Sequence, residues 1–133
     1  MRINLDTNII LDILEKREPF FADSYLVLLN ALENGDLCMM PVSATTDIAY
    51  ILRKAEDVKG KLLDFSFMVK LTDVTTKDFG EAMKADMPDF EDALLAANAK
   101  HNKADCIITR NAKDYANSPI KAFTPAEFLK EWY

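Results

Sequence analysis

The chain begins with a strand–helix unit that reads RINLDTNIILDIL (residues 2–14). Residues 2–5 are a short β-type run, and apolar residues then recur at helical spacing from Ile9 to Leu14. Asp6 stands at the junction, where a carboxylate can cap the helix that follows. The unit therefore predicts a short buried strand that ends in an acidic residue and leads directly into a helix.

The same alternation of short apolar runs and longer helical patterns continues along the chain. Further strands are predicted at residues 37–42, 69–74, 105–109 and 120–123. Further helices are predicted at residues 23–33, 44–54, 58–67, 76–85, 89–102 and 125–132. Strand–helix alternation is typical of parallel sheets that are covered by helices. We therefore predict an α/β fold, a three-layer sandwich with a central, mostly parallel sheet of four to five strands and helices on both faces.

Length and composition favour one domain over residues 1–133. The chain is 50% apolar and 29% charged, which is ordinary for a globular protein. Its net charge of −6 argues against broad nonspecific binding to nucleic acid, which needs a basic face. Cys38 and Cys106 lie in apolar runs and are expected to be buried and free. No apolar stretch is long enough for a signal peptide or a membrane span, so a cytoplasmic protein with no membrane partner is expected.

Polar side chains follow the predicted strands at the points where the strands end. Because the carboxyl ends of parallel strands share one edge of a sheet, these side chains are expected to meet there, together with the start of the helix at 89–102. The residues expected at this edge are Asp6, Ser43, Asp47, Asp89, Asp92, Asn111 and Asp114. Taken singly, each has an ordinary reading as a helix cap, an exposed helix residue or a turn residue. Their convergence is what favours a functional site.

Carboxylates gathered in this way repel one another. Two like charges about 5 Å apart cost about 3 kcal/mol at an effective dielectric constant of about 20. A shared proton or a bound divalent cation relieves the repulsion. Oxygen ligands without a histidine or thiolate favour hard ions such as Mg²⁺ or Mn²⁺. The natural chemistry of such a site is phosphodiester hydrolysis by metal-activated water.

Three stretches resemble the PIN-domain family in order, spacing and structural context. They read LDTNIILD (5–12), DALLAANA (92–99) and ADCIITRN (104–111). The resemblance covers essentially the whole chain. It implies a three-layer α/β fold, metal-dependent ribonuclease activity and, in small stand-alone members, the role of a toxin with a cognate antitoxin.

Asp6 and Asp92 occupy the positions that correspond to the first and third acidic residues of the family pattern. Asp89 is expected to assist Asp92. Asp47 stands where the family usually has a glutamate. Asn111 stands where the family usually has an aspartate, and Asp114 is expected to compensate. The resemblance thus implies that Asp6, Asp47 and Asp92 are catalytic and hold Mg²⁺ or Mn²⁺, with Asp89, Asn111 and Asp114 as further ligands.

The remaining expectations concern substrate and partners. Asn8 and Ser43 are expected to orient carboxylates or water. Arg110, Lys113 and Lys54 are expected to contact RNA, Lys54 because it shares a helix face with Asp47. A small antitoxin protein and a second copy of the chain are the protein partners to consider.

Two other functions stay open. A haloacid-dehalogenase-like phosphatase also begins with a strand and an aspartate, but it commonly has a second aspartate two residues later, where this chain has Asn8. A catalytically weak or inactive PIN-like binding module would fit Asp47 and Asn111, the two departures from the family pattern.

Overall fold

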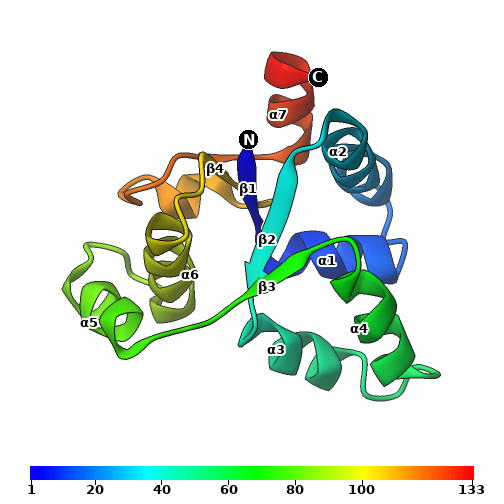
Figure 1. Ribbon diagram of the computed structural model, residues 1–133, viewed down its shortest axis with the longest axis horizontal. Coiled ribbons are helices and arrows are strands. Elements are labelled where there is room, and N and C mark those ends of the chain that lie inside the picture. Colours follow the sequence, from blue (N-terminus) through cyan, green and yellow to red (C-terminus); the bar gives the residue numbers. More distant parts are fainter.

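Five parallel strands form one sheet through the middle of the molecule in the computed structural model, which describes residues 1–133 (Figure 1). The strands are β1 (Arg2–Leu5), β2 (Leu37–Pro41), β3 (Lys70–Thr72), β4 (Cys106–Ile108) and β5 (Ala122–Phe123). Their order is β3-β2-β1-β4-β5, and every neighbouring pair is parallel. The predicted α/β fold is confirmed, with β1 as the central strand.

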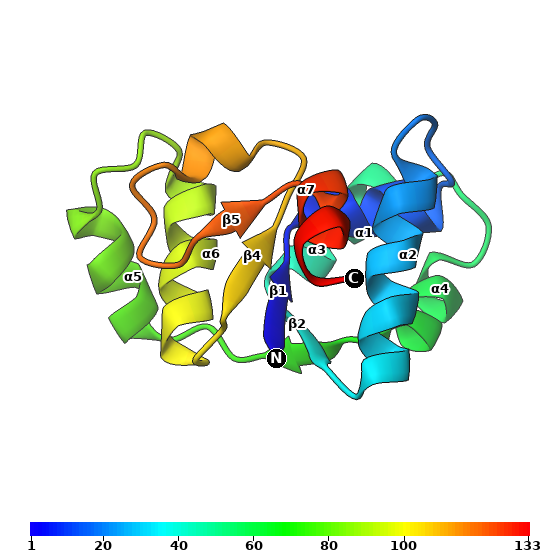
Figure 2. The same ribbon diagram turned by 90° about the horizontal axis from the view of Figure 1, so that it is seen from above.

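Helices cover both faces of this sheet, as Figures 1 and 2 show from two directions. They are α1 (Thr7–Leu14), α2 (Phe21–Asn34), α3 (Ala44–Ile51), α4 (Val58–Ser66), α5 (Thr76–Lys84), α6 (Phe90–His101) and α7 (Pro125–Trp132). A short 3-10 helix spans Ala112–Tyr115. The α5 and α6 helices lie on one side, and α1, α2 and α7 lie on the other with α3 and α4. No helix combines the length and apolar character that a bilayer crossing requires.

Alternating side chains of the strands divide the core into two parts. Ile3 and Leu5 of β1 point to the face that packs against α1, α2 and α7, where a cluster of 20 buried residues forms. Met39 of β2 and Ile107 of β4 point to the other face and meet α6. The buried face of α6 carries several alanines, so this helix can approach the sheet closely. Cys38 and Cys106 are buried and free, as predicted.

Two helices differ from their predicted bounds by two residues or more at one end. The α3 helix ends at Ile51 and not at residue 54, because the chain turns after Leu52 and the Arg53 side chain donates to the Tyr50 carbonyl at 2.9 Å. Lys54 therefore lies beyond the helix, and the expectation that it shares a helix face with Asp47 is wrong. The α2 helix begins earlier than predicted, at Phe21, without a side-chain cap that the sequence could reveal.

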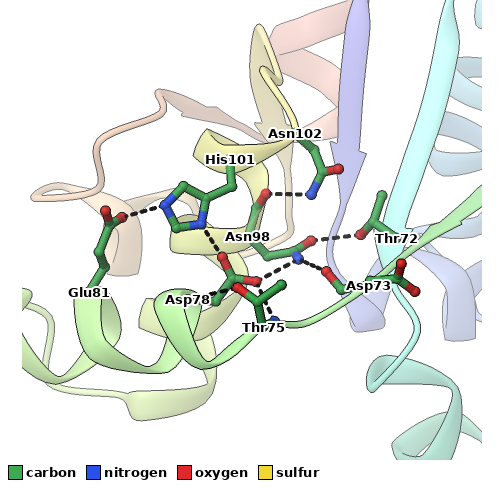
Figure 3. A network of polar contacts seen from close by, with 8 residues as sticks. All are labelled: Thr72, Asp73, Thr75, Asp78, Glu81, Asn98, His101 and Asn102. Atoms are coloured by element: carbon green, nitrogen blue, oxygen red, sulfur yellow. Dashed lines mark hydrogen bonds and ion pairs between the residues drawn. The ribbon is translucent and has the colours of Figure 1, made fainter.

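A network of polar contacts joins β3, α5 and α6 (Figure 3). The Thr72 hydroxyl donates to Asn98 Oδ1 at 2.7 Å, and Asn98 Nδ2 donates to Asp78 Oδ2 at 3.0 Å. Asp78 is almost fully buried and also caps α5 by accepting from the Thr75 N–H. The His101 ring closes the network by contacting Asp78 through Nδ1. These bonds fix α6, whose first turn carries part of the site described next.

Candidate functional site

Asp6 lies where the strand order of the sheet reverses. The chain adds β2 and β3 on one side of β1 and β4 and β5 on the other, and ligands of such sheets bind at this switch point. The Asp6 N–H donates to the Ile108 carbonyl at 2.9 Å. Its Oδ1 accepts from the Thr7 N–H at 2.7 Å, and its Oδ2 accepts from the Thr109 hydroxyl at 2.8 Å. The carboxylate after β1 is therefore fixed to the end of β4.

Asp92 approaches Asp6 from the first turn of α6. Asp89 caps this helix, and its Oδ1 accepts from the Asp92 N–H at 2.9 Å. Both acids contact the buried Tyr115 hydroxyl, which lies 3.2 Å from Asp6 Oδ2 and 3.1 Å from Asp92 Oδ1. A phenol has one hydrogen to donate, so it satisfies one of the two carboxylates at a time. The other contact needs a proton on one carboxyl group or a cation beside the pair.

The pKa values of these groups reflect the crowding of negative charge. Burial, together with the charges of Asp6 and Asp89, raises the pKa of Asp92 to about 6. Burial also raises the pKa of Asp6, against the hydrogen bonds from Thr109, Thr7 and Tyr115. Burial and the two carboxylates raise the pKa of Tyr115 as well, so the phenol stays protonated. The site stabilises positive charge and disfavours further negative charge.

Glu91 is an acid of this site that the sequence analysis did not single out. It lines the cavity of about 250 Å³ that contains Asp6, Asp89 and Asp92. It also lines a neighbouring cavity of about 30 Å³ that contains Asp47. Burial and, next in size, the charge of Asp47 raise the pKa of Glu91 to about 7. Glu91 therefore stands between Asp47 and the Asp6–Asp92 pair.

Two arginines provide positive charge in the larger cavity. Arg17 and Arg110 both line it, together with the acids. Arg110 Nε lies 2.8 Å from Oδ2 of Asp12, a fully buried carboxylate of α1. The Arg110 guanidinium also lies over the Phe20 ring, 4.3 Å from its centroid. Burial raises the pKa of Asp12, and the charges of Arg110 and Arg17 oppose that rise.

The other residues expected at the site take different positions. Asn8 and Asn111 line the larger cavity, and Asn8 Oδ1 accepts from the Arg110 N–H at 3.3 Å. Ser43 lines the smaller cavity with Asp47, so these two do not share the cavity of Asp6 and Asp92. Asp114 lines neither cavity, although its charge contributes to the raised pKa of Asp92.

The basic residues expected to contact RNA are also separated. Arg110 lines the larger cavity, whereas Lys113 and Lys54 line neither cavity. Both lysines are exposed. The positive charge that faces the acids thus comes from Arg110 and from Arg17, which the sequence analysis did not single out.

The donor atoms suit a hard divalent cation with water completing its shell. No three His, Cys, Asp or Glu side chains are arranged to hold one ion directly. Mg²⁺ commonly binds through one or two carboxylates and keeps several waters. Asp6 and Asp92 provide two carboxylates that already share one hydroxyl, and their raised pKa values favour a cation nearby. The residues present therefore fit such an ion.

No local signal in the sequence marks the site residues that were missed. Glu91 directly precedes Asp92 in the first turn of α6, where acids are ordinary partners of the helix dipole, so nothing set it apart. Arg17 follows the end of α1 and carries no local motif. Tyr115 lies 109 residues from Asp6, and no local pattern reports a contact over that separation.

Comparisons with known proteins agree with the fold. The chain resembles one from the VapBC2 complex of Rickettsia felis bound to promoter DNA, at 18% identity and TM-score 0.74 over 93% of this chain and 98% of that one. It also resembles a chain of a toxin–antitoxin complex from Klebsiella pneumoniae, at 20% identity and TM-score 0.71 over 92% and 97%. A chain of VapBC-1 from nontypeable Haemophilus influenzae matches at 15% identity and TM-score 0.68 over 95% and 99%.

The sequence itself was compared in two ways. A comparison with curated proteins returned no match. The family model of the PIN domain matches residues 2–113, from the first strand through the end of β4 and into the 3-10 helix that holds Tyr115. The chain belongs to the PIN-domain family.

Proposed function

We propose that this protein is a metal-dependent endoribonuclease that hydrolyses RNA phosphodiester bonds and serves as the toxin of a toxin–antitoxin pair. The observation that carries the proposal is the division of charge in one cavity of about 250 Å³. Asp6 and Asp92 share the Tyr115 hydroxyl on one side, and Arg17 and Arg110 line the same cavity. A cation on the carboxylates and a phosphate on the arginines would satisfy both sides.

Each of these residues has a separate role in the proposed hydrolysis. Asp6 and Asp92 would hold Mg²⁺ or Mn²⁺, which supplies an activated water and polarises the phosphoryl oxygen when it is bound. Arg110 would hold a phosphate oxygen opposite the carboxylates. The Glu91 carboxylate lines the same cavity and would take the proton of the attacking water. Asp47 would act on this step through Glu91, which it faces.

The partner proposal draws on the similar chains, which come from toxin–antitoxin complexes, and on exposed apolar residues. The outer face of α2 exposes Tyr25, Leu26 and Leu32. An apolar segment of an antitoxin can cover this face. A second copy of the chain is proposed on α4, where Leu63 is exposed.

The proposal is tested by incubating the chain with single-stranded RNA and Mg²⁺ or Mn²⁺, with EDTA as the metal-free control. We expect cleavage that EDTA abolishes. Asp6→Asn should reduce the rate on the order of 100-fold or more, since it weakens both the metal site and its hydrogen bonds. Asp64→Asn is the matched control, because Asp64 is an exposed residue of α4. Equal rates for wild type and Asp6→Asn would contradict the proposal.

Two further measurements separate the alternatives. Calorimetric titration with millimolar Mn²⁺ should show binding to wild type and weaker binding to Asp6→Asn. Absence of binding would instead favour a non-catalytic module. Hydrolysis of a phosphate monoester in place of RNA would favour a phosphatase. That reaction is not expected, because Asn8 is an amide whose oxygen accepts from the Arg110 N–H and cannot carry a proton to a leaving group.

A further inference from the structure

A second cavity, of about 360 Å³, adjoins the cavity of the carboxylates at Arg110. We call it the Phe20 cavity. Its lining residues are Pro19, Phe20, Asp23, Arg110, Thr124, Pro125 and Ala126. Arg110 is the only residue that it shares with the cavity of Asp6 and Asp92. The Arg110 side chain therefore borders both cavities.

Arg110 is held in place from two directions. Its Nε pairs with the fully buried Asp12 at 2.8 Å, and its guanidinium carbon lies over the Phe20 ring, 4.3 Å from the centroid. Asp12 is its only ion-pair partner, so both terminal nitrogens are left without a protein acceptor. An arginine fixed through Nε presents these two nitrogens in a defined plane, which matches the oxygens of a phosphate.

The Phe20 cavity has the chemistry of a site for a nucleoside. Pro19, Phe20 and Pro125 give it an apolar wall against which the face of a base can pack. Asp23 and Thr124 add polar groups, and the Asp23 carboxylate can accept a hydrogen bond from a base or ribose. The carboxylate also repels a bare phosphate, so an anionic group belongs at the Arg110 end and the uncharged part of the ligand beyond it.

We propose that the Phe20 cavity binds the nucleoside adjacent to the phosphodiester bond that is cleaved. The phosphate rests on the terminal nitrogens of Arg110, and the base packs against Phe20 and the prolines. This inference rests on the proposed function, because it places the scissile phosphate between Arg110 and the Asp6–Asp92 pair. The two adjoining cavities would then bind different parts of the RNA. The metal lies in the cavity of Asp6 and Asp92, and the base lies in the Phe20 cavity.

The first test measures binding without metal, so that it does not depend on cleavage. Adenosine 5′-monophosphate, adenosine and inorganic phosphate are titrated in EDTA into the Asp6→Asn chain while NMR follows the Arg110 Nε–H resonance. We expect the nucleotide to shift this resonance and to bind at least fivefold more tightly than phosphate. Equal affinities for nucleotide and phosphate would overturn the proposal, because the base would then contribute nothing.

Substitutions in the lining of the Phe20 cavity test whether the nucleotide binds there. Phe20→Ala should weaken nucleotide binding at least fivefold and phosphate binding by a smaller factor, because the ring also supports the Arg110 guanidinium. Phe79→Ala is the matched control, because Phe79 is an exposed phenylalanine on α5. If Phe20→Ala disturbs the fold, Ala126→Trp replaces it, since Ala126 is exposed and a large side chain there fills the cavity. Unchanged nucleotide affinity in Ala126→Trp would overturn the proposal.

Two outcomes separate this inference from the proposed function. In the cleavage assay, Ala126→Trp should raise KM for RNA by a larger factor than it lowers kcat. If the variant cleaves RNA with the KM of the wild type, the role of the Phe20 cavity is refuted and the nuclease proposal stands. If nucleotide binding depends on Phe20 but the wild-type chain does not cleave RNA, the nuclease proposal is refuted and the role of the cavity stands. Binding of an amino-blocked peptide carboxylate in the cavity, with no binding of the nucleotide, would refute the inference in favour of a protein partner.

Discussion

Replacing His101 by glutamine should destabilise the protein in a way that depends on pH. The His101 ring contacts the buried Asp78 through Nδ1 and lies 3.1 Å from Glu81 Oε2 through Nε2 (Figure 3). Both partners are carboxylates, so the ring is doubly protonated where it makes both contacts. A hydrogen bond to a buried charge contributes about 1.5–3 kcal/mol, and the exposed pair with Glu81 adds little to it because water screens the charges.

The expected loss in His101→Gln is therefore about 2–3 kcal/mol in the free energy of unfolding at mildly acidic pH. It does not reach the full value for an orphaned buried charge, because Asp78 keeps its bonds from the Thr75 N–H and Asn98. For a chain of this size, the melting temperature should fall by roughly 6–12 °C. Urea unfolding followed by circular dichroism measures the change. Lys130→Gln is the control, because it removes one exposed positive charge on α7.

The pH dependence follows from the direction of two pKa shifts. The hydrogen bond with Asp78 raises the pKa of His101 above its ordinary 6.5, so its contribution is complete below that value and is lost as pH rises through the raised pKa. Burial alone would raise the pKa of Asp78, but bonds from Asn98, Thr75 and His101 outweigh it. The pKa of Asp78 falls below 3.8, and its contribution is lost only when pH falls through that lowered value.

The difference between wild type and His101→Gln should accordingly be largest between about pH 4 and pH 6.5 and should shrink in alkaline solution. Urea unfolding curves of both proteins at pH 5.5 and pH 9 measure this difference in the free energy of unfolding. A difference that is the same at both pH values would refute the reasoning, since a neutral imidazole would then stabilise the network as well as the charged one does.

Two other changes test the packing and the backbone. Phe128→Ala should lower the free energy of unfolding by about 3–5 kcal/mol, because Phe128 is fully buried and packs against Phe123 and Trp132; an effect below 1 kcal/mol in urea unfolding would contradict this assignment. Gly35→Ala should cost about 1 kcal/mol, because Gly35 ends α2 at φ 74°, whereas Gly80→Ala should stabilise α5 by up to about 1 kcal/mol, as its new Cβ meets nothing. A higher melting temperature for Gly35→Ala than for Gly80→Ala would contradict this prediction.

Local signals in the sequence were enough to place most of the helices and strands. Thr75 and Thr124 each form a capping box, and Asp6 and Asp89 each cap the helix that follows them. These caps mark where helices begin, and buried apolar runs mark the strands. Prediction failed where no such marker exists: Phe20 precedes α2 without a capping bond, and the end of α3 depends on a turn.

The candidate site was predicted in part for the same reason. Asp6 and Asp92 follow from their positions beside a strand end and at a helix start, and the structure places both in one cavity. The contacts that complete the cavity join distant parts of the chain. Asp12 reads from the sequence as one more residue of the first helix, and only the fold reveals that it anchors Arg110 from α1. Tyr115 likewise acquires its role from two acids that are remote in sequence.

The central position of β1 has a consequence for how the protein is made during translation. The β1 strand precedes β4 in the chain and pairs with it in the register Ile3 with Cys106, so one edge of β1 has no partner until β4 has been synthesised. Asp6 is thus synthesised well before Thr109 and Tyr115, which hold its carboxylate. A nascent chain that stops before β4 therefore carries Asp6 without the side chains that hold its carboxylate.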